Sequence, residues 1–279
     1  LELGMKDKFK FLMNKVSKIL NKFMKPLFNV PGESSLAIIL GIISGYPIGA
    51  KVVCNLKKEK IISKIEAERL IAYTNNSGPL FILSTVGIAL FQNKRIGIIL
   101  LVSHVVSAIL VAYFFKFWKC GHIEYSFNEN KFNLKNMPIK LSNFGEILSN
   151  SIKNAITNIL SIGGFIVIFS VILSILNTSG IINIISNFFN IFGIPINIST
   201  AFITGLLELT NGVFLSANLY KDYYLISILL TSFLLGFAGI SVLFQVYSII
   251  SKENISMKPY ILGKLLQGFI STILTFILL

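Results

Sequence analysis

Apolar residues are grouped along this chain into long stretches, which are separated by short polar or basic segments. Three of these stretches are largely unbroken: residues 96–115, about 147–176 and 260–279. Each is close to the roughly 20 apolar residues that an α-helix needs to cross the hydrocarbon core of a bilayer. The pattern therefore predicts an all-α polytopic membrane protein.

Four other apolar stretches are interrupted near their centres by glycine, proline, asparagine or an acid. Helices break where proline and glycine lie close together, as in "GYPIG" and "NNSGP". The corresponding segments in the second half of the chain are "ELTNG" and "GFAGIS". We expect helix breaks at these four places, which are residues 45–49, 75–79, 208–212 and 236–241.

The order of these elements repeats along the chain. Each half shows an amphipathic helix, a broken pair of helices, a broken span and an unbroken span, and we interpret each broken pair as a re-entrant hairpin. Gly41 matches Gly205, and Gly78 matches Gly239, at nearly equal offsets. The predicted organisation is a basic interfacial helix (1–30), a first repeat (31–115), a cytoplasmic linker (116–145), and a spanning helix followed by the second repeat (146–279).

Composition and charge agree with a membrane protein. Only 13% of the residues are charged and the mean hydropathy is +0.76, whereas about 25% of the residues of a soluble domain are charged. The net charge of +13 would suit a nucleic-acid partner. Lys and Arg cluster between the apolar segments, however, as topology signals do, and we expect a lipid bilayer as partner and no nucleic acid.

The distribution of basic residues also predicts the topology. If the N-terminal helix lies in the cytoplasm, only Lys94, Arg95 and Lys221 fall on the opposite side of the membrane, in agreement with the positive-inside rule. The two hairpins then enter from opposite faces, so the repeats are inverted. Inverted repeats with discontinuous helices are a transporter design, in which the binding site lies at the breaks.

The breaks also supply the candidate binding residues. Unwound backbone offers amides and carbonyls to ions and polar solutes, and polar side chains add donors and acceptors. The alternative is that these groups only satisfy one another, and Gln245 has the further alternative of a hydrogen bond between helices. The candidate substrate- or ion-binding residues are Tyr46, Asn75, Asn76, Ser77, Glu208, Thr210, Asn211, Ser241 and Gln245.

Glu208 is the only acidic residue that we place within the membrane core. A carboxylate there costs about 2.5–3.5 kcal/mol on insertion scales, so a partner must offset the cost. One interpretation makes Glu208 a ligand for a polar substrate, a cation or a proton. The other is a permanent pair with Lys51, which lies just past the first hairpin tip.

Other chemistry is sparse in this sequence. We interpret His104 as a packing histidine that is bonded to a neighbour, in preference to a proton relay. A His–Glu pair in the linker, His122 and Glu124, is too small for a metal site, so we expect no metal and no cofactor, with Na⁺ or H⁺ as coupling ions. No nucleophile elbow, zinc-protease or phosphate-loop motif occurs, and we expect no enzyme.

The segments "NVPG", "GIISGYPIGAK", "NNSGPLFI", "LELTNG" and "GFAGISVLFQVYSII" together resemble the YlbJ-type sporulation integral membrane proteins of the nucleoside-recognition (Gate) group. The resemblance runs from about residue 26 to the C-terminus. It implies a spore-forming Firmicute and a protein of its cell membrane or of a membrane around the forespore. It also implies a fold similar to concentrative nucleoside transporters, which are often trimers, and one more spanning helix before the interfacial one.

In that fold, two opposed hairpins and two unwound helices hold the nucleoside and sodium. The resemblance places residues 75–77 at the first unwound helix and residues 208–211 at the second hairpin tip, while "GFAGIS" lacks the acid of the second unwound helix. We expect a carrier or gate for a small polar solute, for instance a nucleoside-like one, in the sporulating cell. The alternative is a non-transporting component that assembles or signals during formation of the spore envelope and its cortex.

Overall fold

The computed structural model describes residues 20–120 and 144–279, and this part of the chain is helical throughout, without a strand. It contains four helices that are long and apolar enough to cross a membrane, or five if a bent pair near the N-terminus counts as one span. The prediction of an all-α polytopic membrane protein is confirmed. Most of the predicted interfacial helix and linker lies outside the described residues.

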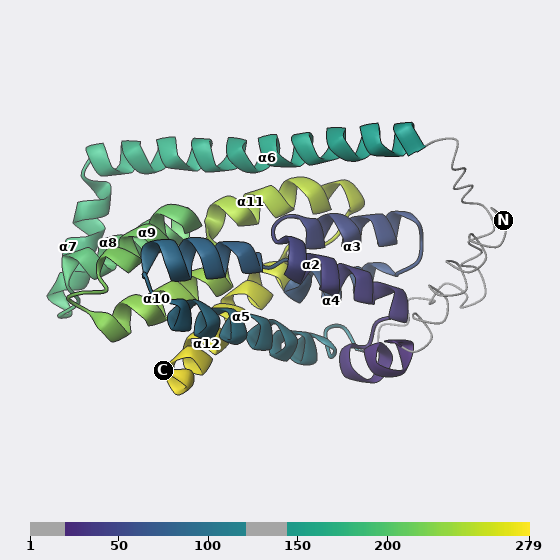
Figure 1. The fold of residues 1–279 in the computed structure, drawn as a ribbon, viewed down its shortest axis with the longest axis horizontal. Helices are drawn as coiled ribbons and strands as arrows, with labels where there is room; N and C mark the ends of the chain where they lie inside the picture. Colours follow the sequence, from purple (N-terminus) through teal and green to yellow (C-terminus); the bar gives the residue numbers. More distant parts are fainter. Residues whose placement is uncertain (1–19, 121–143) are drawn as a thin grey trace.

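The first half of the described chain begins with a helix over Leu20–Phe28, which meets the next helical segment at 89°. Two short helices then form a hairpin, two more are separated by the unwound residues 75–78, and one long helix completes the half (Figure 1). The elements are η1 (Gly32–Ser34), α2 (Ser35–Ser44), α3 (Ile48–Lys58), α4 (Lys64–Thr74), the π-helix η2 (Phe81–Leu90) and α5 (Lys94–Phe115).

The second half has the same order after one additional long helix, α6 (Phe144–Thr178). Figure 1 shows α6 along one edge of the molecule, where it packs on α11 and meets α7 and α8 at its end. The remaining elements are α7 (Ile181–Ile191), α8 (Ile196–Leu207), α9 (Leu209–Asn218), α10 (Tyr224–Phe237), α11 (Gly239–Ile250), η5 (Ser251–Glu253) and α12 (Lys258–Leu278).

Helix breaks occur at all four predicted places. The first two are several residues long, at residues 45–47 and 75–78. The other two are narrower than predicted, because a single residue, Glu208 or Ala238, separates two helices. Glu208 is itself the N-cap of the next helix. Ala238 and Gly239 both have positive φ, so the chain changes direction at these two residues without a longer loop.

Glycine allows the first hairpin to lie directly on the end of α4. A Cβ atom at Gly41 would lie 1.7 Å from the carbonyl oxygen of Thr74, and one at Gly49 would lie 2.1 Å from it. Both helices of the hairpin therefore contact the residue just before the first unwound segment. Larger residues at these two positions would push the hairpin away from that segment.

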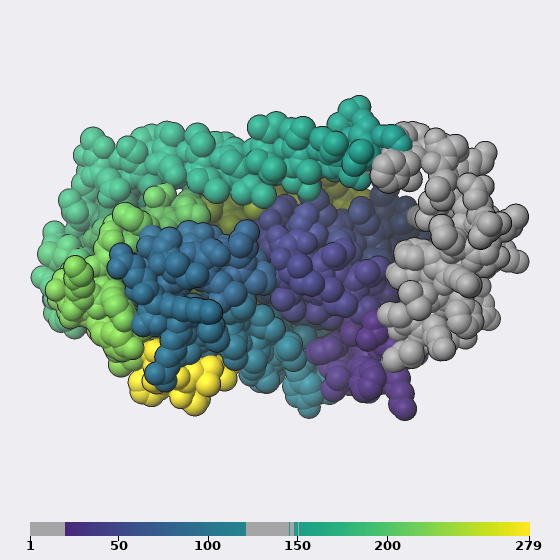
Figure 2. All heavy atoms as spheres, in the orientation of Figure 1, coloured from purple at the N-terminus to yellow at the C-terminus, as the bar shows by residue number. Residues whose placement is uncertain are grey.

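Helix α12 makes the most extensive contacts between the two halves. It packs on α10 from its own half and on α4 and α5 from the other half. The contact with α4 is close, because a Cβ atom at Gly263 would lie 2.3 Å from the carbonyl oxygen of Ala72. In the space-filling view of Figure 2, α6 forms the edge of the molecule, and the rest of the described chain lies to one side of it.

Candidate functional site

The first unwound segment, residues 75–78, is held by side chains from α5 and α12. Asn75 Nδ2 donates to the hydroxyl of Tyr260 at 2.9 Å. Asn76 Oδ1 accepts from Gln267 Nε2 at 2.9 Å, and the backbone N–H of Ser77 donates to His104 Nε2 at 3.2 Å. The predicted polar cluster at this break therefore exists, and two elements distant in sequence complete it.

Lys264 on α12 joins this cluster through Gln267, and its side chain is 0% exposed. Its Nζ donates to Gln267 Oε1 at 2.7 Å and lies 5.4 Å from the centroid of the Tyr46 ring. In the described part of the chain no carboxylate pairs with it. We call Tyr46, Asn75, Asn76, Ser77, His104, Tyr260, Lys264 and Gln267 the Lys264 cluster.

The positive-inside argument counts Lys264 among the basic residues on or near the cytoplasmic side, whereas the structure buries its side chain inside the bundle. The burial follows from the packing of α12 on α4, because Gly263 lets the two helices approach at this level. A sequence signal was present. Apart from Thr272, the polar residues of this segment lie at positions 260, 264, 267, 271 and 275, and this spacing places them on one face of a helix.

Some buried polar atoms near the first break have no hydrogen-bond partner among the residues that the structure describes. They include Asn75 Oδ1 and His104 Nδ1, and on α11 Gln245 Nε2 is likewise without a partner. Buried polar groups are normally paired. Because His104 Nε2 accepts a hydrogen bond, its neutral ring carries the proton on Nδ1. The predicted bond from His104 to a neighbour is confirmed, and one donor of the ring remains available.

Glu208 has a different environment from the Lys264 cluster. It precedes α9 and is 1% exposed. Its carboxylate accepts from the N–H and hydroxyl of Thr210 at 3.0 and 2.6 Å, and from the N–H and side-chain amide of Asn211 at 2.8 and 2.9 Å. Asn211 also donates to Ser170 on α6 at 3.3 Å. Four hydrogen bonds at a helix N-terminus, where the helix dipole favours an anion, explain how this carboxylate is accommodated.

The predicted pair between Glu208 and Lys51 is wrong for this structure. Lys51 Nζ hydrogen-bonds to Asn158 Oδ1 on α6 instead, and no ion pair links Lys51 to Glu208 in the described chain. Lys51 lies one turn past the tip of the first hairpin, and its side chain reaches the neighbouring long helix.

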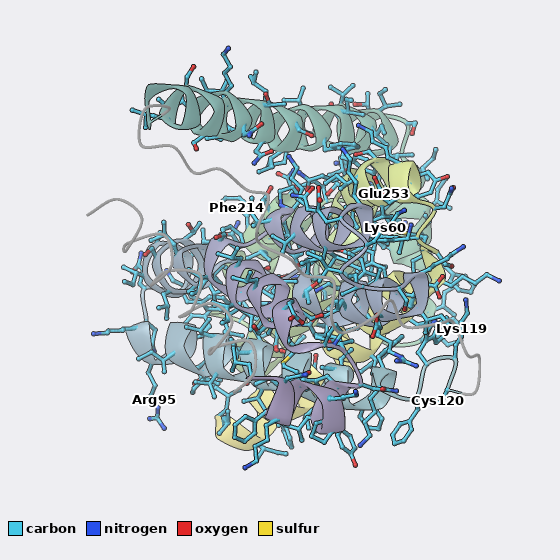
Figure 3. All side chains as sticks on the ribbon, turned by 90° about the vertical axis from the view of Figure 1, so that its right-hand side faces the viewer. Lys60, Arg95, Lys119, Cys120, Phe214 and Glu253 are labelled. Carbon is cyan, nitrogen blue, oxygen red and sulfur yellow. The ribbon has the colours of Figure 1, made fainter. Side chains whose placement is uncertain are left out.

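A second buried acid was not singled out from the sequence. Glu68 on α4 is fully buried, and its carboxylate lies 2.8 Å from Lys119 Nζ and accepts from Trp118 Nε1 at 3.0 Å. Its neighbour Arg69 donates to the backbone oxygens of Trp118 and Asn29. This ion pair joins α4 to the segment after α5. Arg95, by contrast, points away from the bundle, as Figure 3 shows.

The four breaks pack as two pairs. A Cβ atom at Gly45 would lie 2.9 Å from the N atom of Gly78, so the first hairpin tip lies on the first unwound segment. One at Gly239 would lie 3.0 Å from the Gly205 carbonyl oxygen and 3.1 Å from the Leu209 N atom, so the second tip lies on the second broken span.

Tyr46 connects the two pairs, because its hydroxyl donates to the carbonyl oxygen of Leu235 on α10 at 3.5 Å. Ser241 and Gln245 are buried on α11. No hydrogen bond between described residues joins either side chain to the Lys264 cluster. The structure therefore brings together the candidates of the first break, and separately those of the second hairpin.

Comparison with known proteins gives one informative relative, the sporulation integral membrane protein YlbJ of Bacillus subtilis strain 168. The two are 31% identical over 281 residues, which cover 94% of this chain and 68% of the relative. No protein-family model and no solved structure matches this chain. Together with the membrane-spanning helices, this similarity makes the chain an integral membrane protein associated with sporulation. The chain belongs to the YlbJ family of sporulation integral membrane proteins.

Proposed function

We propose that this protein is a carrier or gate for a small anionic solute in a membrane of the sporulating cell, and that the solute binds at the Lys264 cluster. The observation that carries the proposal is the position of Lys264, which is fully buried beside the first helix break with neutral partners only. A buried ammonium group needs a counter-charge. An incoming carboxylate or phosphate group supplies one.

The surroundings of Lys264 suit such a solute. His104 Nδ1 offers a donor to an anion, and Asn75 Oδ1 offers an acceptor to a hydroxyl or amine of the same molecule. Tyr46 and Tyr260 add aromatic rings to the cluster. An ionisable residue within a membrane bundle is by default a candidate functional residue, and this one lies at a break, where transporters hold their substrates.

The predicted inverted repeats belong to this proposal. Two features support them: the repeated order of hairpin, broken span and whole helix, and the position of the hairpins α2–α3 and α8–α9 towards opposite ends of the bundle (Figure 1). In this mechanism the hairpins are re-entrant, and the two halves move against each other around the breaks. Similarity to the Gate group and to nucleoside transporters, and assembly as a trimer, are further parts of the proposal.

A second candidate is a non-transporting component that acts in assembly or signalling during formation of the spore cortex. The burial of the cluster favours it, since Asn75, Asn76, Lys264 and Gln267 are at most 1% exposed. In that case the polar groups would hold α4, α5 and α12 together permanently. Ligand binding separates the two candidates.

The proposal is tested by thermal unfolding of the purified protein in detergent, with uridine, glutamate, inorganic phosphate and dipicolinate as probes. A ligand at one hundred times its dissociation constant adds about 2.7 kcal/mol, which is several degrees in Tm for a chain of this size. We expect at least one anionic probe to stabilise the protein, and neutral uridine to have no effect. A shift with uridine alone contradicts an anionic solute, and no shift with any probe favours the assembly role.

A further inference from the structure

We infer that Lys264 takes up one proton when the anionic solute binds, so that the solute and the proton occupy the site together. This inference rests on the proposed function and adds the identity of the coupling ion.

The hydrogen bonds around Lys264 suit an uncharged amine. An ammonium group has three N–H donors, but only one acceptor among the described residues, Gln267 Oε1, bonds to Nζ. The amide of Gln267 is fixed in this orientation, because its Nε2 donates to Asn76 Oδ1 and to the His104 carbonyl oxygen at 2.9 and 3.3 Å. Protonation without an anion would therefore leave two buried donors unpaired.

Among the residues that the structure describes, no negative charge faces Lys264 from the elements packed against α12. The titratable neighbours are Tyr46 from the first hairpin, His104 from α5 and Tyr260 from α12 itself, and each is uncharged in its ordinary state at neutral pH. The fully buried acid of α4, Glu68, pairs with Lys119.

The second hairpin offers no counter-charge either, since the Glu208 carboxylate already accepts four hydrogen bonds at the start of α9. A buried ion without a partner is neutralised in preference to remaining charged. The empty site therefore holds the neutral amine.

An anion changes this balance, because it supplies the missing charge and the missing acceptors. The step is RNH₂ + H⁺ + A⁻ → RNH₃⁺···A⁻, in which the Nζ lone pair forms one N–H bond with a proton from water and no other bond changes. Binding of a monoanion then adds no net charge to the protein. Movement of the solute is then coupled to a proton, because the residue that binds the solute also takes up the proton.

The test counts protons by calorimetry of the purified full chain with dipicolinate, in two buffers of different ionisation enthalpy at the same pH. We expect the wild type to show a buffer-dependent enthalpy that corresponds to uptake of about one proton. The affinity for dipicolinate should also fall about tenfold for each unit by which the pH rises, over the pH range in which Lys264 of the empty site is neutral. Lys264→Arg should bind without proton uptake, because a guanidinium group stays protonated.

The outcomes separate this inference from the proposed function. Wild-type binding that is independent of both buffer and pH overturns the inference and leaves the proposed function standing. Proton uptake that persists in Lys264→Arg also overturns it, since another group then takes the proton. No binding of dipicolinate by the wild type counts against both. The pH dependence of the wild type decides the question if the arginine variant does not fold.

Discussion

Replacing Lys264 by methionine is expected to abolish stabilisation by anionic probes and to leave the fold intact. Methionine has a similar length and fills the same space with an apolar chain. Removing one partner of a buried, hydrogen-bonded charge pair costs about 2–5 kcal/mol of binding free energy. The affinity for an anion should therefore fall by a factor on the order of 30 to several thousand.

Thermal unfolding with and without the anionic probes checks this prediction. Lys258→Met is the matched control, because Lys258 is an exposed residue at the start of the same helix. The control should keep the full ligand-induced shift. A Lys264→Met variant that is stabilised as strongly as the wild type would show that the anion binds elsewhere.

Replacing Glu208 by alanine is expected to reduce the stability of the protein itself, with or without ligand. The change removes the cap of α9 and all four hydrogen bonds to the carboxylate. Loss of an N-cap costs about 0.5–2 kcal/mol, and leaving the half-buried donors of Thr210 and Asn211 without the carboxylate adds about 1–3 kcal/mol in total. We expect a loss of about 2–5 kcal/mol, which corresponds to a fall in Tm of roughly 10 °C.

The thermal unfolding temperature of the ligand-free variant measures this effect. Glu59→Gln serves as control, because Glu59 is exposed at the end of α3, and a surface change of this kind stays within about 0.5 kcal/mol. If Glu208→Ala unfolds at the wild-type temperature, the carboxylate does not stabilise the fold as a cap.

Features that depend on neighbouring residues could be predicted from the sequence. Glycine, proline and asparagine at residues 45–47 and 75–78 disfavour a continuous helix locally, and the breaks lie there. The extent of the two later breaks was overestimated. A single acidic residue can follow the end of one helix and cap the next, so residues 210 and 211 are already helical.

Features that depend on packing could not be predicted in the same way. Lys264 lies a few residues inside α12, so that in the sequence it resembles a topology signal at the end of a span. Its burial depends on the contact between Gly263 and Ala72, which joins residues almost two hundred positions apart. The predicted partner of Lys51 was wrong for the same reason. Its actual partner, Asn158, belongs to a helix whose position relative to the first hairpin cannot be read from the sequence.

The most direct test of the account is uptake of labelled dipicolinate into liposomes that contain the purified protein. We predict faster uptake than in protein-free liposomes, with the same acceleration for Lys258→Met and none for Lys264→Met. Wild-type protein that is folded in the liposomes but takes up dipicolinate, phosphate and glutamate no faster than the protein-free control would contradict the carrier function.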